Sequence, residues 1–341
     1  MHAIKLASVL SPLSDANLRM AAQSGVEEIV ARYSGPDLSS INTNQARIES
    51  FGMRLGVIEG GLPIDAIKLG VDDGTELDQM KALVRHLGTI GVPIVCYNFM
   101  AGTDWIRTSI DTPERGGSKV TAFDLGRLGD ARIPGHDPYI GTLEPGARRD
   151  DLWANLEAFL NEIIPVAEEA GVVMAIHPDD PPFSLFGLPR VVSTADDARK
   201  LLNAIPSPAN GLTMCAGSYG ARGDNDLVAM IREFHDRIYF VHLRNIKRED
   251  DGSFYESDHL DGDNDIVGIV NALLDEEQQR QGLPPGRCTI PMRPDHGHAM
   301  GEEKSDAAVR PGYSYAGRMK GLAELRGVMH ALTASRRFHE L

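Results

Sequence analysis

Hydrophobic residues along the chain form two alternating patterns. Short apolar runs rich in β-branched residues predict buried strands, and segments with an apolar residue at every third or fourth position predict amphipathic helices. In residues 76–91, for example, Met80, Leu83 and Leu87 fall on one helical face. The predicted strands are 3–10, 26–32, 54–59, 93–99, 172–177, 211–215, 238–242 and 289–292. The predicted helices are 14–24, 37–50, 76–91, 150–170, 194–205, 225–235, 265–281 and 317–335.

This alternation of strands and helices predicts an α/β protein with a (β/α)8 or TIM barrel, a single domain over residues 1–341. An open doubly wound sheet is the rival architecture. No G-x-G-x-x-G motif follows an early strand, so nothing supports a dinucleotide-binding version of that sheet. The alternation stops at residues 100–149, which are rich in Gly, Pro, Asp and Thr and show no periodic segment. We interpret them as a long excursion after the fourth strand that covers the ligand-bearing face as a lid.

The composition and net charge of the chain exclude some classes of function. A content of 42% hydrophobic and 24% charged residues is enough for a globular core. The net charge of −15 argues against nucleic acid or an anionic membrane as partner, and therefore against a metal-dependent endonuclease on this fold. No apolar run reaches the roughly 18 residues of a spanning helix, and the amino terminus does not resemble a signal peptide. Three scattered cysteines give no disulfide framework, so a cytoplasmic location is expected.

Residues that can bind a metal stand at or just after the ends of the last four predicted strands. Each alone has an ordinary structural explanation, such as a buried cysteine or a core histidine with a hydrogen bond. In a barrel, however, the carboxyl ends of all strands meet at one end. Two imidazoles, a thiolate and a carboxylate suit Mn²⁺, Fe²⁺, Co²⁺ or Zn²⁺ better than Mg²⁺ or Ca²⁺. We therefore predict a catalytic metal site made of His177, Cys215, His242 and Asp295.

Other polar residues near these strand ends are candidates for contact with a substrate. Arginine is the preferred partner of a carboxylate, whereas Lys320 is also explained by surface ion pairs. His296 and His298 are candidates for proton transfer because imidazole titrates near neutral pH, and either of them alternatively supports a metal ligand. Tyr313 and Tyr315 precede the last helix, where a tyrosine serves as an acid, a hydrogen-bond donor or a lid anchor. The predicted substrate-binding residues are Arg244, Asn245, Arg293 and His298.

Several longer motifs are similar to those of a known family. The chain resembles mannonate dehydratase, the metal-dependent barrel family related to xylose isomerase. The resemblance is clear from about the fourth strand to the last helix, and weaker in the first 90 residues. The motifs that carry it are HPDDPP (177–182), MCAGS (214–218), VHLRN (241–245), HLDGD (259–263), RPDHGH (293–298) and the segment 311–327 that begins PGYS.

The resemblance implies a hydro-lyase that converts D-mannonate to 2-keto-3-deoxy-D-gluconate in hexuronate (glucuronate) catabolism, with Mn²⁺ or Fe²⁺ as cofactor. It implies His296 and Tyr313 as the pair that transfers protons. It also implies the same four metal ligands that the strand ends predict. The partner is then a small sugar acid, and a homo-oligomer is expected, although no exposed apolar stripe identifies an interface.

Departures from the family pattern keep other substrates open. Ala216 stands where a Thr is expected after the cysteine, and Tyr315 stands where a small residue is expected after the serine. Together with Tyr219 these residues can reshape the pocket, so a sugar acid other than mannonate is one alternative. A second alternative is an isomerase or epimerase of the xylose-isomerase-like group, which Cys215 as a ligand disfavours. A third is a non-catalytic sugar-acid-binding protein, which the retention of every ligand disfavours.

Overall fold

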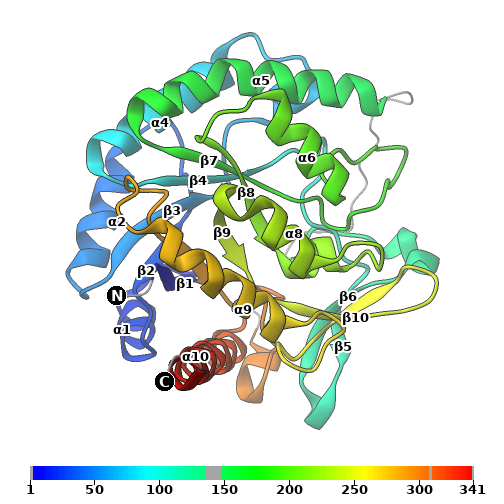
Figure 1. The fold of residues 1–341 in the computed structure, drawn as a ribbon. Helices are drawn as coiled ribbons and strands as arrows, with labels where there is room; N and C mark the ends of the chain where they lie inside the picture. The colour runs from blue at the N-terminus through cyan, green and yellow to red at the C-terminus, as the bar shows by residue number, and fades with distance from the viewer. Residues whose placement is uncertain (1–2, 135–147, 307–308, 340–341) are drawn as a thin grey trace.

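Eight parallel strands close into a barrel, and helices surround it (Figure 1). The computed structural model describes residues 3–134, 148–306 and 309–339. Around the barrel the strands follow the order β1, β2, β3, β4, β7, β8, β9 and β12, and β12 pairs again with β1. The predicted (β/α)8 fold is confirmed. The strands are β1 (Ile4–Val9), β2 (Glu28–Ala31), β3 (Arg54–Glu59), β4 (Ile94–Asn98), β7 (Val173–His177), β8 (Asn210–Cys215), β9 (Ile238–His242) and β12 (Ile290–Arg293).

All the predicted helices form, and local signals explain where they begin and end. The Ser14 hydroxyl caps the first helix by accepting from the Asn17 amide, and Thr194 forms a capping box with Asp197. Gly171 ends its helix in the left-handed conformation that glycine adopts without strain. The helices are α1 (Asp15–Gln23), α2 (Ser39–Glu49), α4 (Thr75–Ile90), α5 (Arg149–Ala170), α6 (Ala195–Ala204), α8 (Leu227–Phe234), α9 (Ile266–Glu276) and α10 (Tyr315–His339). Two short helices were not predicted, α3 (Asp65–Leu69) and α7 (Ala216–Gly220).

Alternate residues of each strand face the barrel interior and the helices. In β4, Cys96 contacts Thr213 of β8, two strands away in the barrel order, so this side chain points inward. Tyr97, the next residue, packs with the helices and stacks edge-on against Phe159 of α5. Both faces of each strand are therefore buried, which is why the strands appear in the sequence as continuous apolar runs.

The excursion differs from the prediction, because part of residues 100–149 forms regular structure. Four strands form an antiparallel sheet, here called the inserted sheet: β5 (Ser109–Pro113), β6 (Lys119–Phe123), β11 (Phe254–Ser257) and β10 (Asn245–Arg248). β5 pairs with β6, β6 with β11, and β11 with β10. The segment 247–263, which reads as a polar loop, thus supplies a second hairpin. Figure 1 shows β5, β6 and β10 together at one side of the barrel. Residues 135–147 of the predicted excursion lie outside the described residues.

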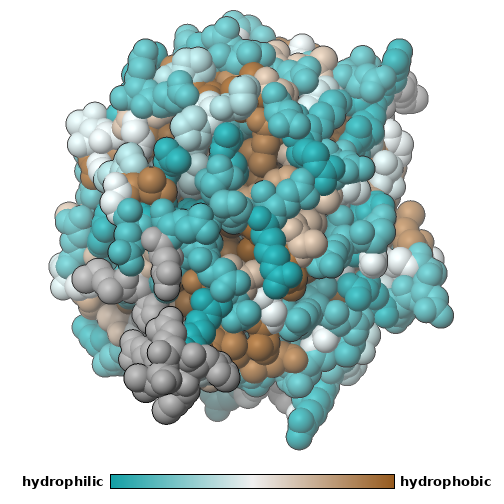
Figure 2. Space-filling model, viewed as in Figure 1, coloured by the Kyte–Doolittle hydropathy of each residue, from teal (hydrophilic) through white to brown (hydrophobic). Residues whose placement is uncertain are grey.

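The surface shown in Figure 2 is mainly hydrophilic, with apolar residues in separate patches between polar side chains. Among the described residues, no helix is both long enough and apolar enough to cross a membrane.

The contact between α4 and α5 depends on a glycine. A Cβ atom at Gly88 would lie 2.4 Å from the carbonyl oxygen of Ala170, so we expect Gly88→Ala to destabilise the protein by about 1–3 kcal/mol through overpacking. Gly327 in α10 is the matched control, because a Cβ there meets nothing within 4 Å. Gly327→Ala should stabilise the protein by up to about 1 kcal/mol through helix propensity. Thermal unfolding of both variants tests this, and equal shifts in Tm would contradict the close packing.

Candidate metal centre and active site

The carboxyl ends of the barrel strands surround a cavity of about 460 Å³. Its wall combines charged, imidazole and phenol groups from segments far apart in the chain, which is the usual composition of a site that binds a small polar molecule. Five of the predicted site residues line it, namely His177, Arg293, Asp295, His296 and Tyr313.

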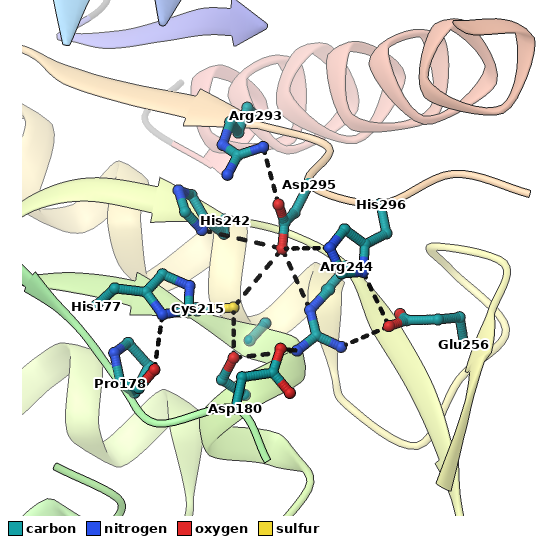
Figure 3. A network of polar contacts seen from close by, with 12 residues as sticks. His177, Pro178, Asp180, Cys215, His242, Arg244, Glu256, Arg293, Asp295 and His296 are labelled. Carbon is teal, nitrogen blue, oxygen red and sulfur yellow. Dashed lines mark hydrogen bonds and ion pairs between the residues drawn. The ribbon is translucent and has the colours of Figure 1, made fainter. Parts of the chain in front are cut away.

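The four predicted metal ligands lie together. His177, Cys215 and His242 are the last residues of β7, β8 and β9, and their ligand atoms all lie within 4.8 Å of one another. Asp295 follows β12 by two residues. Its Oδ2 lies 3.9 Å from the sulfur of Cys215 and 4.0 Å from Nδ1 of His242 (Figure 3). The barrel thus brings two imidazoles, a thiol and a carboxylate to one point, as the strand-end pattern predicts.

The polar atoms at this point fit a bound cation. Neither ring nitrogen of the buried His242 makes a hydrogen bond, and a buried polar atom without a partner is costly. Nδ1 of His177 lies 2.7 Å from the Pro178 carbonyl oxygen, which leaves Nε2 for a metal. Burial opposes protonation of His177, but its contacts with Cys215 and nearby carboxylates raise its pKa to about 9, so these groups attract positive charge to the position that a metal cation would take in place of the proton. Burial, with the charge of Arg293, holds the pKa of His242 well below its usual range, which keeps that imidazole in the neutral form that binds metals.

His296 and Tyr313, the predicted proton-transfer pair, are neighbours in the cavity wall. Their ring centroids lie 5.3 Å apart, and Trp105 packs against both rings at 4.5 and 5.9 Å. Backbone pairing between Gly297 and Tyr313 holds the two loops in register. Burial, with the negative charge of Asp295, raises the pKa of the Tyr313 phenol, which therefore keeps its proton at neutral pH.

The two arginines predicted to bind substrate have different surroundings. Arg293 lines the cavity and forms ion pairs with Glu59 and Asp295 at 3.0 and 2.8 Å. Arg244 does not line the cavity but is buried directly behind its wall, with its guanidinium group 2.6 Å from Asp180 and 3.2 Å from Asp295, which both line it.

Asn245 and His298 do not line the cavity either. The side-chain amide of Asn245 donates to the carbonyl oxygens of His259 and Asn264, so it holds the backbone between the inserted sheet and α9. Nδ1 of His298 lies 3.6 Å from Asp258, outside the cavity wall. Lys320 pairs with Asp258 and Glu324, as its structural explanation predicts. Other cations line the cavity in their place, namely Arg32, Lys68 and Arg310.

Comparison with known proteins identifies the family. The family model described as D-mannonate dehydratase (UxuA) matches residues 12–339. The mannonate dehydratase of Saccharophagus degradans is 46% identical, and the match covers 97% of this chain and 98% of that protein. The crystal structure of mannonate dehydratase from Streptococcus suis serotype 2 superposes with a TM-score of 0.86 at 33% identity, over 98% of this chain and 96% of that one. The chain belongs to the D-mannonate dehydratase family. It is therefore a hydro-lyase of a metal-dependent family, and its substrate is a small sugar acid.

The alternative of an isomerase or epimerase receives support for the fold alone. A structure of L-ribulose 3-epimerase covers 99% of this chain with a TM-score of 0.56, at 15% identity. The D-mannonate dehydratase family shares the barrel with such enzymes, and the barrel does not decide the reaction.

One acidic residue of this D-mannonate dehydratase site was missed in the sequence. Glu59 is the last residue of β3, and its carboxylate lies 3.4 Å from Nε2 of His242. Glu59, Cys96 and His242 form a second group of potential ligand atoms within 4.8 Å of one another. The strand-end rule that selected the four ligands would have found Glu59 too, because residues 54–59 were a predicted strand.

The donor set predicts what loss of the thiol does to metal binding. Loss of a residue that only supports a metal ligand costs about 10- to 100-fold in affinity, so Cys215→Ala should weaken Mn²⁺ binding by at least about 100-fold. Cys288→Ala is the control, because Cys288 is a free cysteine that belongs to neither group of potential metal ligands among the described residues. Titration of the metal-stripped variants with Mn²⁺ measures the change. Equal affinities for the two variants would exclude Cys215 as a ligand.

Proposed function

We propose that the chain removes water from D-mannonate to give 2-keto-3-deoxy-D-gluconate, a step of hexuronate catabolism, with Mn²⁺ or Fe²⁺. The observation that carries the proposal is the gathering of a mixed nitrogen, sulfur and oxygen donor set at the wall of a cavity that an imidazole and a phenol also line, in a D-mannonate dehydratase family member. His177 and Asp295 line this cavity, and Cys215 and His242 lie directly behind them. The residues proposed to hold the metal are His177, Cys215, His242 and Asp295. A cytoplasmic location and a homo-oligomeric state stay predictions from the sequence.

The reaction needs a proton removed from C2 and a hydroxyl group released from C3. The C2 proton of an aldonate is weakly acidic, and a bound divalent cation would offset the negative charge that develops on the neighbouring carboxylate. The chain itself supplies the proton transfers. One group takes the C2 proton, a second group protonates the C3 hydroxyl as it leaves as water, and the resulting enol converts to the 2-keto acid.

His296 and Tyr313 are the proposed groups for these two transfers. The phenol of Tyr313 carries its proton at neutral pH, as a phenol ordinarily does, so Tyr313 is proposed to protonate the leaving hydroxyl. His296, whose ring lies 5.3 Å away, then takes the C2 proton.

Arginines of the cavity wall are proposed to hold the sugar acid. Arg293 stands beside the metal ligand Asp295, and Arg32 and Arg310 line other parts of the same cavity. A guanidinium group binds a carboxylate through two parallel hydrogen bonds, which fixes the orientation of the acid as well as attracting its charge.

The substrate is tested with Mn²⁺-loaded protein and a panel of D-mannonate, D-altronate, D-gluconate and L-gulonate. We expect formation of a 2-keto-3-deoxy acid from D-mannonate, with kcat/KM at least about tenfold above the other acids, since misplacing one hydroxyl in a hydrogen-bonding site is costly. His296→Asn should lower kcat by at least about 100-fold. Preference for another acid would replace the substrate, and no product from any acid would overturn the proposal.

The metal is tested by stripping the protein with a chelator and restoring it with single ions. Mn²⁺ and Fe²⁺ should restore turnover of D-mannonate, whereas Mg²⁺ should not, because a site with thiolate and imidazole ligands disfavours a hard cation. Stronger restoration by Zn²⁺ or Co²⁺ than by Mn²⁺ and Fe²⁺ would contradict the proposed cofactor and leave the ligand set intact.

A further inference from the structure

A carboxylate outside the barrel reaches the imidazole of the active site. Glu256 lies in β11 of the inserted sheet, and its Oε1 is 2.9 Å from Nδ1 of His296. Both side chains are buried, with 4% and 6% of each residue exposed. Residues of β11 alternate between buried and half-buried, and Glu256 shares the buried side with Phe254. The pairing of β11 with its neighbours therefore directs Glu256 toward the cavity wall.

Two arginines hold this carboxylate in its ionised form. Nη2 of Arg107 and Nη1 of Arg244 lie 3.0 and 2.8 Å from the same oxygen of Glu256. Both guanidinium groups also bind Asp180, at 2.7 and 2.6 Å, so two cations and two anions alternate in a buried ring. Although burial opposes ionisation, the charge of Arg244 and of its neighbours holds the pKa of Glu256 well below its usual range.

An ionised carboxylate only accepts hydrogen bonds, and this decides the state of the imidazole. Nδ1 of His296 must carry a hydrogen in order to donate to Glu256, so the lone pair of the neutral ring is on Nε2. Nε2 faces the metal-ligating side of the cavity, 3.8 Å from Oδ2 of Asp295 (Figure 3). Trp105 packs against the ring at a centroid distance of 4.5 Å and limits its rotation.

We propose that Glu256 is a positioning residue that fixes His296 in the tautomer and orientation in which Nε2 exchanges a proton with the substrate. The inference rests on the proton-transfer role of His296 proposed above. The inference gives the inserted sheet a part in the reaction, because Glu256 lies in that sheet. The two arginines that pair with Glu256 also lie outside the barrel strands. Arg107 immediately precedes the β5–β6 hairpin, and Arg244 follows β9.

Glu256→Gln tests the proposal in the Mn²⁺-loaded enzyme with D-mannonate. Glutamine fills nearly the same space, but its neutral amide oxygen accepts a weaker hydrogen bond from Nδ1 than a carboxylate does, and it no longer offsets the positive charge of His296 when Nε2 takes a proton. We expect kcat to fall by about 100-fold, while KM and bound Mn²⁺ stay within about threefold of wild type. A merely structural role would lower stability without this separation of kcat from KM.

Glu276→Gln is the matched control. Glu276 is also a buried carboxylate, 5% exposed, that lies 2.7 Å from Nδ1 of a histidine, His235, and 3.3 Å from the guanidinium of Arg280. None of these residues lines the cavity. The control should lower Tm, as expected when a buried ion pair loses one partner, and leave kcat within about twofold of wild type.

A second variant, called the compensated variant, tests the proposal in case Glu256→Gln does not fold. Loss of the carboxylate leaves buried positive charge, which is strongly destabilising. The double variant Arg107→Gln with Glu256→Gln removes one cation together with one anion and should fold. Its kcat should be as low as that expected for Glu256→Gln.

His296→Asn, measured alongside, separates the two proposals. Wild-type turnover by His296→Asn would remove the proposed role of His296, and the positioning inference with it. Slow turnover by His296→Asn, together with a kcat within about twofold of wild type in Glu256→Gln or the compensated variant, would overturn the positioning inference alone. Loss of bound Mn²⁺ in these variants without loss of kcat in their metal-loaded fraction would overturn it as well, because Glu256 would then support the metal site.

Discussion

Closure of the parallel barrel is the constraint on which the site depends. In an open sheet the ends of distant strands stay apart, whereas closure turns the carboxyl ends of all eight strands toward one axis. His177, Cys215 and His242 end three consecutive strands of the barrel order, so adjacent-strand pairing places them side by side. Closure adds Glu59, which ends β3 on the opposite side of the barrel order from β9, yet lies 3.4 Å from His242. Asp295 joins them because β12 pairs with β9 in register, with Arg293 opposite His242. The arrangement of the four candidate ligands is thus a consequence of backbone hydrogen bonding.

The second constraint on this structure is that each buried charged side chain needs a partner of opposite charge. Arg107, Arg244, Asp180 and Glu256 are nearly inaccessible to water, and burial of any one of them alone would be prohibitive. Together they form a neutral ring with short contacts between every neighbouring pair. Such a ring adds little stability over an apolar core of the same volume, but it holds each member in one geometry. That rigidity is useful beside an imidazole whose orientation matters.

The sequence predicted the parts of this structure that local pattern determines. Helices with capped ends and apolar stripes, such as 76–91 and 194–205, were found nearly to the residue. The candidate metal ligands followed from one rule about strand ends, and the same rule would have given Glu59. The family resemblance added the proposed roles of His296 and Tyr313, which no spacing argument supplies.

The inserted sheet was missed for a physical reason. β5 is half-buried or exposed along its whole length, so its residues show no apolar alternation. It pairs with β6, and β6 in turn pairs with β11, which lies more than a hundred residues further along the chain. Glu256 was missed with it, since a glutamate in an apparently polar loop gives no sign of burial. Arg244 was predicted to bind substrate because arginine binds carboxylates. In the structure its guanidinium group contacts three carboxylates of the protein itself, those of Asp180, Glu256 and Asp295. A side chain's chemistry can be read from sequence, whereas the identity of its partner depends on long-range pairing. Residues that orient reacting groups are therefore the hardest to predict from a single sequence.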